Sequence, residues 1–471
     1  MSTATSSSDV VIVGSGPGGA TVARQLARAG RQVTLLERGR DWRSHPLYGT
    51  YLGAMLYTDK ASFLSTQEGL TIIRPLMLGG ATSMYCGCAA RPLPWWKERY
   101  GIDLNGFAEE TISELQIAPL PPELRGVAST RLAEAAAEVG QTWQPQDKFM
   151  SPGRAASFNC TAKCMLGCRC GAKWNAAEYV DEAVAAGGEL WTQTTVQRVL
   201  VQDGQVTGVE GTRGGRPFTL TANVVVLAAG GLGTPAILRN SSHGEAYTFY
   251  HENPRPSAPS ASHPRLSGLS EAGRGLTMDT TAMVYGHAPY RGIGYEPPMT
   301  WSYADDELGA MFSTLIDPWL NYPIAMLRKG PAYPLTWYRW GRTLGVMIKL
   351  KDEVSGGLNE DGRISKGLTT ADRQRLAQAE QVARQILLKA GCQPDSIFLT
   401  PLRGTHPSGT VRIGEMLSAD LETEIKNLYV CDASVFPEAL ARPTVLTIIA
   451  LAKRLALHLG RGWIIGQDLQ D

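Results

Sequence analysis

The sequence predicts an α/β protein: a discontinuous Rossmann-like domain with an inserted α+β domain built on an antiparallel sheet. The chain opens with a strand, a glycine-rich turn, a helix and a second strand, and a similar strand, turn and helix recurs at Val224 to Ser241. The segment from His243 to Asp395 then carries strand-and-turn patterns. We therefore expect residues 1–242 and 396–471 to form one domain and residues 243–395 the other, which suits a chain of 471 residues.

The opening unit has the features of a dinucleotide-binding turn. The β-branched run DVVIV, residues 9–13, is typical of a strand buried in a parallel sheet. The turn after it fits GxGxxG at Gly14, Gly16 and Gly19. In that order, these glycines turn the chain, admit a pyrophosphate to the backbone and allow close helix packing, while the helix from Pro17 supplies N–H groups. The second strand, RQVTLL, ends at Glu37, whose carboxylate suits the hydroxyls of a ribose.

Charge and hydropathy exclude several classes of protein. The formal net charge is +1 and there is no basic run, so we expect no nucleic-acid binding. The N-terminal MSTATSSSD lacks the basic and apolar regions of a secretory signal, and we expect a cytoplasmic protein. The apolar segment from Val445 to Leu459 is interrupted by Lys453 and Arg454, which favours a buried helix over a membrane span.

The inserted segment contains three further patterns. Thr370 to Ala390 has apolar residues at helical spacing and is followed by Gly391, which predicts a long core helix. The Pro/Ser-rich stretch from His251 predicts a surface loop or linker. The run from Asp317 to Arg342 mixes aromatic residues, prolines and cations. It suits core packing, a partner surface, contact with a membrane surface or the mouth of an apolar pocket, and the last motivates the hypothesis of a small lipophilic or aromatic hydroxyl substrate.

Five further segments carry distinctive patterns: LMLGGATSMYCGCAARP from Leu76, TTVQRVLVQDGQVTGVEG from Thr194, VVVLAAGGLGTPAILRNS from Val224, HPSGTVRIG from His406, and NLYVCDASVFPEALARPTVLTIIALAKRLA from Asn427. Together these segments resemble the glucose-methanol-choline (GMC) family of FAD-dependent oxidoreductases. The resemblance implies that the discontinuous domain binds FAD and that the inserted domain covers the substrate. Beyond the glycine turn and Glu37, the cofactor contacts it implies are Gly80, Ser83, Tyr85, Val196, Gly230, Asp432 and Ala433.

The resemblance also implies a catalytic residue, because the family's catalytic histidine corresponds to His406 in THPSGT. A flavin oxidises an alcohol when a base takes the hydroxyl proton as hydride leaves the carbon, and imidazole suits that role. Where the family usually has a second His or Asn, this sequence has Pro443 or Arg442. Neither can replace that partner, so we expect Arg442 to stabilise an alkoxide or carboxylate, or the second role to lie elsewhere. Other redox or redox-neutral chemistry, and a non-catalytic electron-transfer subunit, are the alternative functions.

Four of the eight cysteines lie in NCTAKCMLGCRCGAKW, residues 159–174. GCxxGAK resembles a turn of many GMC dehydrogenases and long-chain alcohol oxidases, and NCTAKC resembles the cluster segment of sugar dehydrogenases in the family. With the CxxxCxxxCxC spacing, this favours an iron–sulfur cluster of the 4Fe-4S or 3Fe-4S type on Cys160, Cys164, Cys168 and Cys170. Zinc, and unmetallated thiols that pack a turn, are the alternatives. A cluster would pass electrons from the flavin to an external acceptor, such as a protein, and would favour a dehydrogenase over an oxidase.

Overall fold

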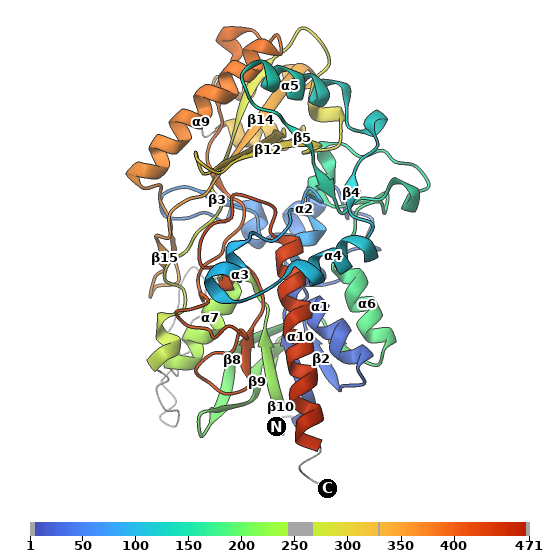
Figure 1. Cartoon of the computed structure of the whole chain (residues 1–471), viewed down its shortest axis with the longest axis vertical. Coiled ribbons are helices and arrows are strands. Elements are labelled where there is room, and N and C mark those ends of the chain that lie inside the picture. Colours follow the sequence, from blue (N-terminus) through green and yellow to red (C-terminus); the bar gives the residue numbers. More distant parts are fainter. Residues whose placement is uncertain (1–4, 244–266, 328–329, 468–471) are drawn as a thin grey trace.

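The computed structural model describes residues 5–243, 267–327 and 330–467. Within these ranges the chain folds around two large sheets, one in the lower half and one in the upper half of Figure 1. The predicted α/β fold is thereby confirmed. None of the helices in the described ranges is long and apolar enough to cross a membrane. Residues 251–266 of the Pro/Ser-rich stretch lie outside the described residues.

The lower sheet has the strand order β7-β2-β1-β10-β9-β8, and β19 also pairs with β10. β10 is its central strand, because it pairs with β1 on one edge and with β9 and then β19 on the other. Pairing is parallel except among β10, β9 and β8. The strands are β1 (Thr5–Val13), β2 (Val33–Leu36), β7 (Glu189–Trp191), β8 (Thr194–Gln202), β9 (Gln205–Arg213), β10 (Arg216–Leu227) and β19 (Leu428–Val430).

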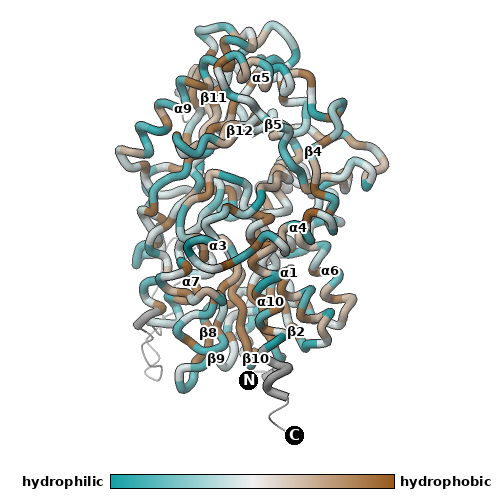
Figure 2. The backbone as a smooth tube through the Cα atoms, viewed as in Figure 1, coloured by the Kyte–Doolittle hydropathy of each residue, from teal (hydrophilic) through white to brown (hydrophobic). Residues whose placement is uncertain are grey.

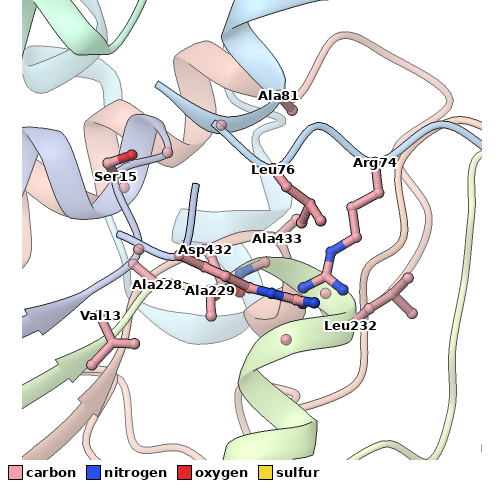
Figure 3. Close-up of a pocket in the computed structure, with 18 of the residues that line it drawn as sticks. Val13, Ser15, Arg74, Leu76, Ala81, Ala228, Ala229, Leu232, Asp432 and Ala433 are labelled. Carbon is pink, nitrogen blue, oxygen red and sulfur yellow. Dashed lines mark hydrogen bonds between the residues drawn. The ribbon is translucent and has the colours of Figure 1, made fainter. Parts of the chain in front are cut away.

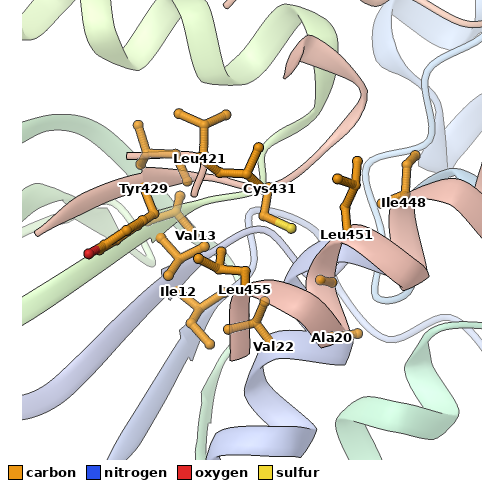
Figure 4. Packing of buried hydrophobic residues seen from close by; sticks show 14 of the residues in the cluster. Ile12, Val13, Ala20, Val22, Leu421, Tyr429, Cys431, Ile448, Leu451 and Leu455 are labelled. Atoms are coloured by element: carbon orange, nitrogen blue, oxygen red, sulfur yellow. The ribbon is translucent and has the colours of Figure 1, made fainter. Parts of the chain in front are cut away.

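Helices cover this sheet and close its apolar core. α1 packs against α10 and α6, and α10 packs against α4. Side chains of β1, α1, β19 and α10 meet around Cys431 (Figure 4), and the central strands are among the most hydrophobic segments in Figure 2. The helices are α1 (Pro17–Arg28), α4 (Asn105–Glu114), α6 (Ala177–Ala185), α7 (Gly230–His243) and α10 (Val445–Gln467). The apolar segment from Val445 is therefore a core helix, as predicted.

The upper sheet has the order β3-β18-β11-β14-β13-β12-β5, with β17 paired to β11. Its pairing is antiparallel apart from β18 with β3. The strands are β3 (Thr71–Ile72), β5 (Gln144–Pro145), β11 (Thr281–His287), β12 (Trp301–Asp305), β13 (Ala310–Thr314), β14 (Thr343–Leu350), β17 (Phe398–Leu399) and β18 (Arg403–Gly404). The antiparallel sheet predicted for the inserted domain is thus present.

Helix α9 (Thr370–Lys389) covers β11, β13 and β14 and confirms the long core helix that the sequence predicts. It begins at a capping box in which the Thr369 side chain accepts from the backbone N–H of Asp372 and the Asp372 side chain accepts from that of Thr369. It ends before Gly391, whose φ of 87° suits a residue without a Cβ. Leu376, Ala383 and Leu387 are among the residues on its buried face.

The upper domain takes more of the chain than residues 243–395. Strands β3 and β5 and helix α5 (Val127–Glu138) precede that range, and β17 and β18 follow it. The physical reason is that the apolar face of α5, which includes Leu132 and Ala136, packs against α9 and joins the upper core. The predicted boundary at residue 243 therefore differs from the structure. The remaining elements are α2 (Tyr51–Tyr57), α3 (Trp95–Tyr100), α8 (Asn321–Leu327), β4 (Ala118–Pro119), β6 (Asp147–Lys148), β15 (Gly357–Leu358) and β16 (Ile364–Ser365), besides short 3₁₀ turns.

Candidate active site

A cavity of about 510 Å³ lies where β1, β2 and β10 end (Figure 3). Strand ends of this kind are where α/β sheets commonly bind ligands. Segments from three separate parts of the chain line it: residues 13–18, 36–38, 72–76, 80–81, 194–197, 212, 228–233, 236–237, 240, 405–407, 432–433, 444–445 and 448. The predicted residues Gly14, Gly16, Glu37, Gly80, Val196, Gly230, His406, Asp432 and Ala433 are among them.

The glycine turn has the geometry that its spacing predicts. Gly14 has a φ of 104°, and a Cβ there would lie 2.3 Å from the carbonyl oxygen of Ala228. A Cβ on Gly19 would lie 2.0 Å from the carbonyl oxygen of Gly14, so only glycine lets α1 approach the strand this closely. Gly16 precedes the first turn of α1 and adds no side-chain cap. The first N–H groups of α1 are therefore available to an anionic group in the cavity.

Glu37 is buried directly after β2 and binds the same turn. Its Oε2 accepts hydrogen bonds from the backbone N–H of Ser15 at 3.0 Å and from the Ser15 hydroxyl at 2.5 Å, and its Oε1 accepts from Gly39 N–H at 2.7 Å. A carboxylate oxygen accepts more than one hydrogen bond, so the ribose role predicted for Glu37 is compatible with these contacts. The structure adds that Glu37 positions the turn itself.

Asp432 connects the turn at Gly230, where α7 begins, to the C-terminal segment. Its Oδ2 accepts from the Gly230 N–H at 2.8 Å and from the Thr234 hydroxyl at 2.5 Å, and its Oδ1 accepts from the Ser434 N–H at 2.7 Å. Burial raises the pKa of Asp432, while these hydrogen bonds oppose that shift. Both carboxylate oxygens of Asp432 thus accept hydrogen bonds from the protein. The backbone of Asp432 and Ala433, which line the cavity, is therefore the better candidate for contact with a ligand.

Strand pairing in the upper sheet fixes the position of His406. β11 and β18 are antiparallel with Thr281 opposite Arg403, and this register places Asp279 opposite Thr405, one residue before His406. The Nδ1 of His406 lies 2.7 Å from Oδ2 of Asp279, whose side chain is 1% exposed. Burial lowers the pKa of His406, nearby Lys349 lowers it further, and Asp279 opposes both. A neutral imidazole at the cavity wall can accept a proton.

Some predicted site residues lie outside the cavity lining. Ser83 is buried, with its hydroxyl bound to the Leu78 carbonyl at 3.0 Å, and the Tyr85 hydroxyl donates to the Trp174 carbonyl at 3.0 Å. Arg442 does not line the cavity either, because its guanidinium pairs with Asp306 at 2.7 Å. The Asp306 side chain is 79% exposed, so Arg442 is directed to the surface and not to the reacting group. The expected catalytic role of Arg442 is corrected accordingly.

Sequence reasoning missed two charged residues of this site. Asp279 binds His406 but stands in TMDTTAM, a segment without a motif. Arg74 extends its guanidinium over α7 near Leu232 (Figure 3) and lies 3.3 Å from Asp59. Arg74 lies two residues before the glycine-rich segment that begins at Leu76, and a cation next to a segment that resembles a cofactor-binding part of the family is the signal that could have identified it.

The four clustered cysteines contact one another in sequence order. The Cys164 thiol contacts those of Cys160 and Cys168, and the Cys168 and Cys170 sulfurs are 3.8 Å apart. The hydrogen bond to the Cys160 thiol and burial raise the pKa of Cys164 to about 12. Among the residues that the structure describes, no group of three or more His, Cys, Asp or Glu side chains could hold a metal ion. The residues as placed therefore do not fit the predicted iron–sulfur cluster.

The cavity does fit a flavin dinucleotide. The N-terminus of α1 and the glycine backbone suit its pyrophosphate, and the buried Glu37 suits its adenosine ribose. Val196 of β8 lines the same cavity, so its backbone is available to the adenine. His406 lines the cavity as well, where a group that exchanges protons with a substrate is needed.

Comparisons with known proteins agree with this fit. Residues 53–270 and 363–452 match two family models, each described as GMC oxidoreductase, and residues 9–50 match one described as FAD dependent oxidoreductase. A GMC-type oxidoreductase of Mycobacterium tuberculosis, itself described as uncharacterized, is 32% identical over 257 residues, which cover 50% of this chain and only 39% of that protein. A long-chain-alcohol oxidase of Arabidopsis thaliana is 23% identical over 522 residues, with 94% of this chain and 66% of that protein covered.

A solved structure shares the architecture along nearly the whole chain. The pyridoxine 4-oxidase from Mesorbium loti superposes with a TM-score of 0.68, and the match covers 96% of this chain and 99% of that one. The two sequences are 17% identical, so this likeness shows the fold alone.

Proposed function

Because the chain belongs to the GMC oxidoreductase family, we propose that it oxidises a CH–OH group of a small molecule, with FAD as the cofactor and His406 as the proton acceptor. One observation carries this proposal: His406 lines the cavity that contains the glycine turn, and a carboxylate binds the other side of its ring. FAD, when bound, supplies the acceptor for the two electrons that leave the alcohol as hydride.

Each residue of the site has a definite task in this reaction. The N-terminus of α1 binds the anionic pyrophosphate of the cofactor, and the turn at Gly230 lines the same cavity. Glu37 holds the glycine turn in place. His406 takes the hydroxyl proton on the ring nitrogen that Asp279 does not occupy. Because its pKa is below the usual value of 6.5, the imidazole is neutral at pH 7 and ready to accept that proton.

Replacement of His406 tests the assignment directly. His406→Gln should retain bound flavin, visible in its absorbance spectrum, yet lose flavin reduction when a panel of alcohols is added without oxygen. His458→Gln is the matched control, because His458 lies on α10 with 42% of its side chain exposed. Reduction of His406→Gln at the wild-type rate would remove His406 from its role. A wild-type protein that no alcohol reduces would favour redox-neutral chemistry or a non-catalytic electron-transfer subunit.

For the substrate class we propose a lipophilic or aromatic alcohol. Two observations support it: the similarity to a long-chain-alcohol oxidase, and exposed aromatic and aliphatic side chains on the upper domain. The rings of Trp319 and Trp337 lie 4.8 Å apart, and Trp319, Leu335 and Tyr338 are 39%, 72% and 68% exposed. A series of primary alcohols of increasing chain length should show a kcat/KM that rises with length, whereas turnover of sugars alone would contradict the proposal.

The electron acceptor is a separate question, and we propose a dehydrogenase that reduces an external acceptor. The predicted iron–sulfur cluster rests on the cysteine spacing and on the resemblance of NCTAKC to the cluster segment of sugar dehydrogenases. Because the cysteines as placed do not fit it, no step of the reaction is assigned to it. Analysis of iron and acid-labile sulfide in anaerobically purified protein decides whether a cluster is bound. Comparison of the turnover rate with oxygen and with an artificial electron acceptor separates an oxidase from a dehydrogenase, and faster turnover with oxygen would overturn the dehydrogenase assignment.

A further inference from the structure

The strand register that places His406 also groups Thr281, Lys349, Arg403 and Thr405 on one face of the sheet. Thr281 of β11 pairs with Lys349 of β14 on one side and with Arg403 of β18 on the other. Directly paired residues share a face of the sheet, and Thr405, two residues after Arg403, follows on that face. Lys349 Nζ donates to the Thr405 hydroxyl at 2.6 Å, and that hydroxyl donates to the Asp279 carbonyl at 3.0 Å. A continuous set of contacts thus connects Lys349 to the residue that binds His406.

Asp279 also joins the upper domain to the C-terminal segment. Its Oδ2 faces His406 at 2.7 Å, while its Oδ1 accepts the backbone N–H of Ala441 at 2.8 Å. Ala441 stands just before Arg442 and Pro443, where the family pattern would place the second catalytic side chain. The Asp279 carboxylate therefore lies next to the position where the family's second catalytic side chain is absent from this chain.

The backbone at both ends of this contact is strained. Asp279 has a φ of 45° and Ala441 a φ of 51°, values that residues with a Cβ seldom adopt. Such conformations persist where the surroundings impose them, and they gather at functional sites. Here the restraint is a buried ion pair: Asp352, bound to Lys366 at 2.8 Å, accepts the backbone N–H groups of Met278 and Thr280 on either side of Asp279. The fold therefore holds the Asp279 carboxylate in one orientation.

Lys349 brings a positive charge to the same place. Its side chain is buried, and the residues on either side of it in β14, Ile348 and Leu350, are apolar. Within the described part of the chain its ammonium hydrogen-bonds hydroxyls, those of Thr405 at 2.6 Å and Thr281 at 3.4 Å, and no carboxylate. Burial lowers the pKa of Lys349, and the charge of Asp279 opposes that shift. Lys349 and Asp279 are the two charged groups that act on His406, in opposite directions.

We propose that Asp279 is the positioning residue of this active site and that Lys349 balances its charge. The Asp279 carboxylate accepts the Nδ1–H of His406, so the lone pair on Nε2 faces the reacting alcohol. During oxidation the O–H bond of the alcohol would break as the Nε2–H bond forms, and bound FAD would supply the acceptor for the electron pair of the C–H bond. The resulting imidazolium is then paired with Asp279. This inference rests on the proposed alcohol oxidation and explains how one histidine can act without the family's usual second partner.

Two substitutions should act in opposite directions on the pH profile of anaerobic flavin reduction. Asp279→Asn removes the charge that stabilises imidazolium, so the rate should fall roughly 10-fold to 100-fold and its acid limb should move to lower pH. Lys349→Met removes the opposing charge, so the acid limb should move to higher pH. Lys351→Met is the matched control, because Lys351 follows β14, its side chain is 41% exposed and it pairs with Glu438 at 2.8 Å. This variant should leave the pH profile unchanged. Profiles of both variants that coincide with that of the wild type would overturn the proposal.

A second measurement needs no disruptive variant. Nitrogen NMR of holoenzyme labelled with ¹⁵N-histidine, assigned by His406→Gln, reports which ring nitrogen carries the proton. We expect a protonated Nδ1 and an unprotonated Nε2 at neutral pH, and the reverse tautomer would refute the positioning role even if Asp279→Asn fails to fold. If His406→Gln abolishes flavin reduction while Asp279→Asn does not alter it, only the positioning role fails; if neither alters it, the proposed function fails as well.

Discussion

Gly231→Ala should disable the site without touching His406. Gly231 is the second residue of α7, and a Cβ built there lies 1.9 Å from the carbonyl oxygen of Pro407 and 2.4 Å from its carbonyl carbon. Ordinary contacts begin at 3.4 Å, so the helix or the His406 loop must move by about 1.5 Å. Because Pro407 directly follows His406, much of this movement reaches the imidazole.

The expected loss follows from that displacement. A misplacement of about 1 Å in a catalytic group costs on the order of 100-fold in rate, and overpacking costs about 1–3 kcal/mol of stability. Without the clash, alanine in a helix would be favourable by up to about 1 kcal/mol relative to glycine, so the close contact reverses the sign of the effect. Gly106→Ala in α4 is the matched control, because nothing lies within 4 Å of its Cβ.

Both variants are compared by anaerobic flavin reduction, by flavin content from the absorbance spectrum and by thermal unfolding. Gly231→Ala should lose both rate and thermal stability, whereas Gly106→Ala should keep its rate and a Tm at least equal to that of the wild type. If Gly231→Ala reduced its flavin within about twofold of the wild-type rate, with an unchanged Tm, the close packing of α7 on the His406 loop would be wrong.

Three further predictions concern individual side chains. Glu37→Ala removes two hydrogen bonds from Ser15 of the glycine turn and one from Gly39, so purified protein should contain less flavin and should unfold about 1–3 kcal/mol more easily in urea. Arg442→Ala should change kcat by less than about threefold and stability by less than about 1 kcal/mol, because the partner Asp306 is 79% exposed; a larger loss of kcat would restore Arg442 to the site. The pKa of His406 is lowered from 6.5, so the unfolded chain binds this proton more tightly and stability should fall as pH drops below 6.5; urea titrations should show a weaker decline in His406→Gln.

Local chemistry made part of this site predictable from the sequence. The glycine turn, the acid at the end of β2 and helix α9 each depend on residues that lie close together in the chain, and all are present as expected. The placement of His406 in the cofactor cavity also agrees with the sequence prediction, because it lies within a recognisable motif. Spacing and motif thus located the glycine turn, Glu37 and His406, each of which lies in a short continuous segment.

The contacts that sequence reasoning missed depend on tertiary register. Asp279 and His406 are 127 residues apart, and they are brought together by the pairing of β11 with β18 and by the bridge between Thr277 and Ser408. The resemblance predicted a cofactor contact for Tyr85, but its hydroxyl donates to the Trp174 carbonyl. A polar group in a protein interior is normally hydrogen-bonded, and here the partner is a residue distant in the sequence. The domain boundary was misplaced for a similar reason: α5 precedes the insert in the chain but packs on α9.

The position of β19 and α10 has a consequence for the order in which the protein can be made. β10 has β19 as an edge partner, and α1 packs on α10, so the N-terminal unit acquires these neighbours only after residue 428 has been translated. At ~5–20 residues per second, a nascent chain spends about 20 to 80 s with the surface of α1 uncovered and about 10 to 40 s with the edge of β10 unpaired. Ribosome-bound intermediates should therefore depend on chaperones throughout that interval, and flavin should be retained only once the last helix has emerged.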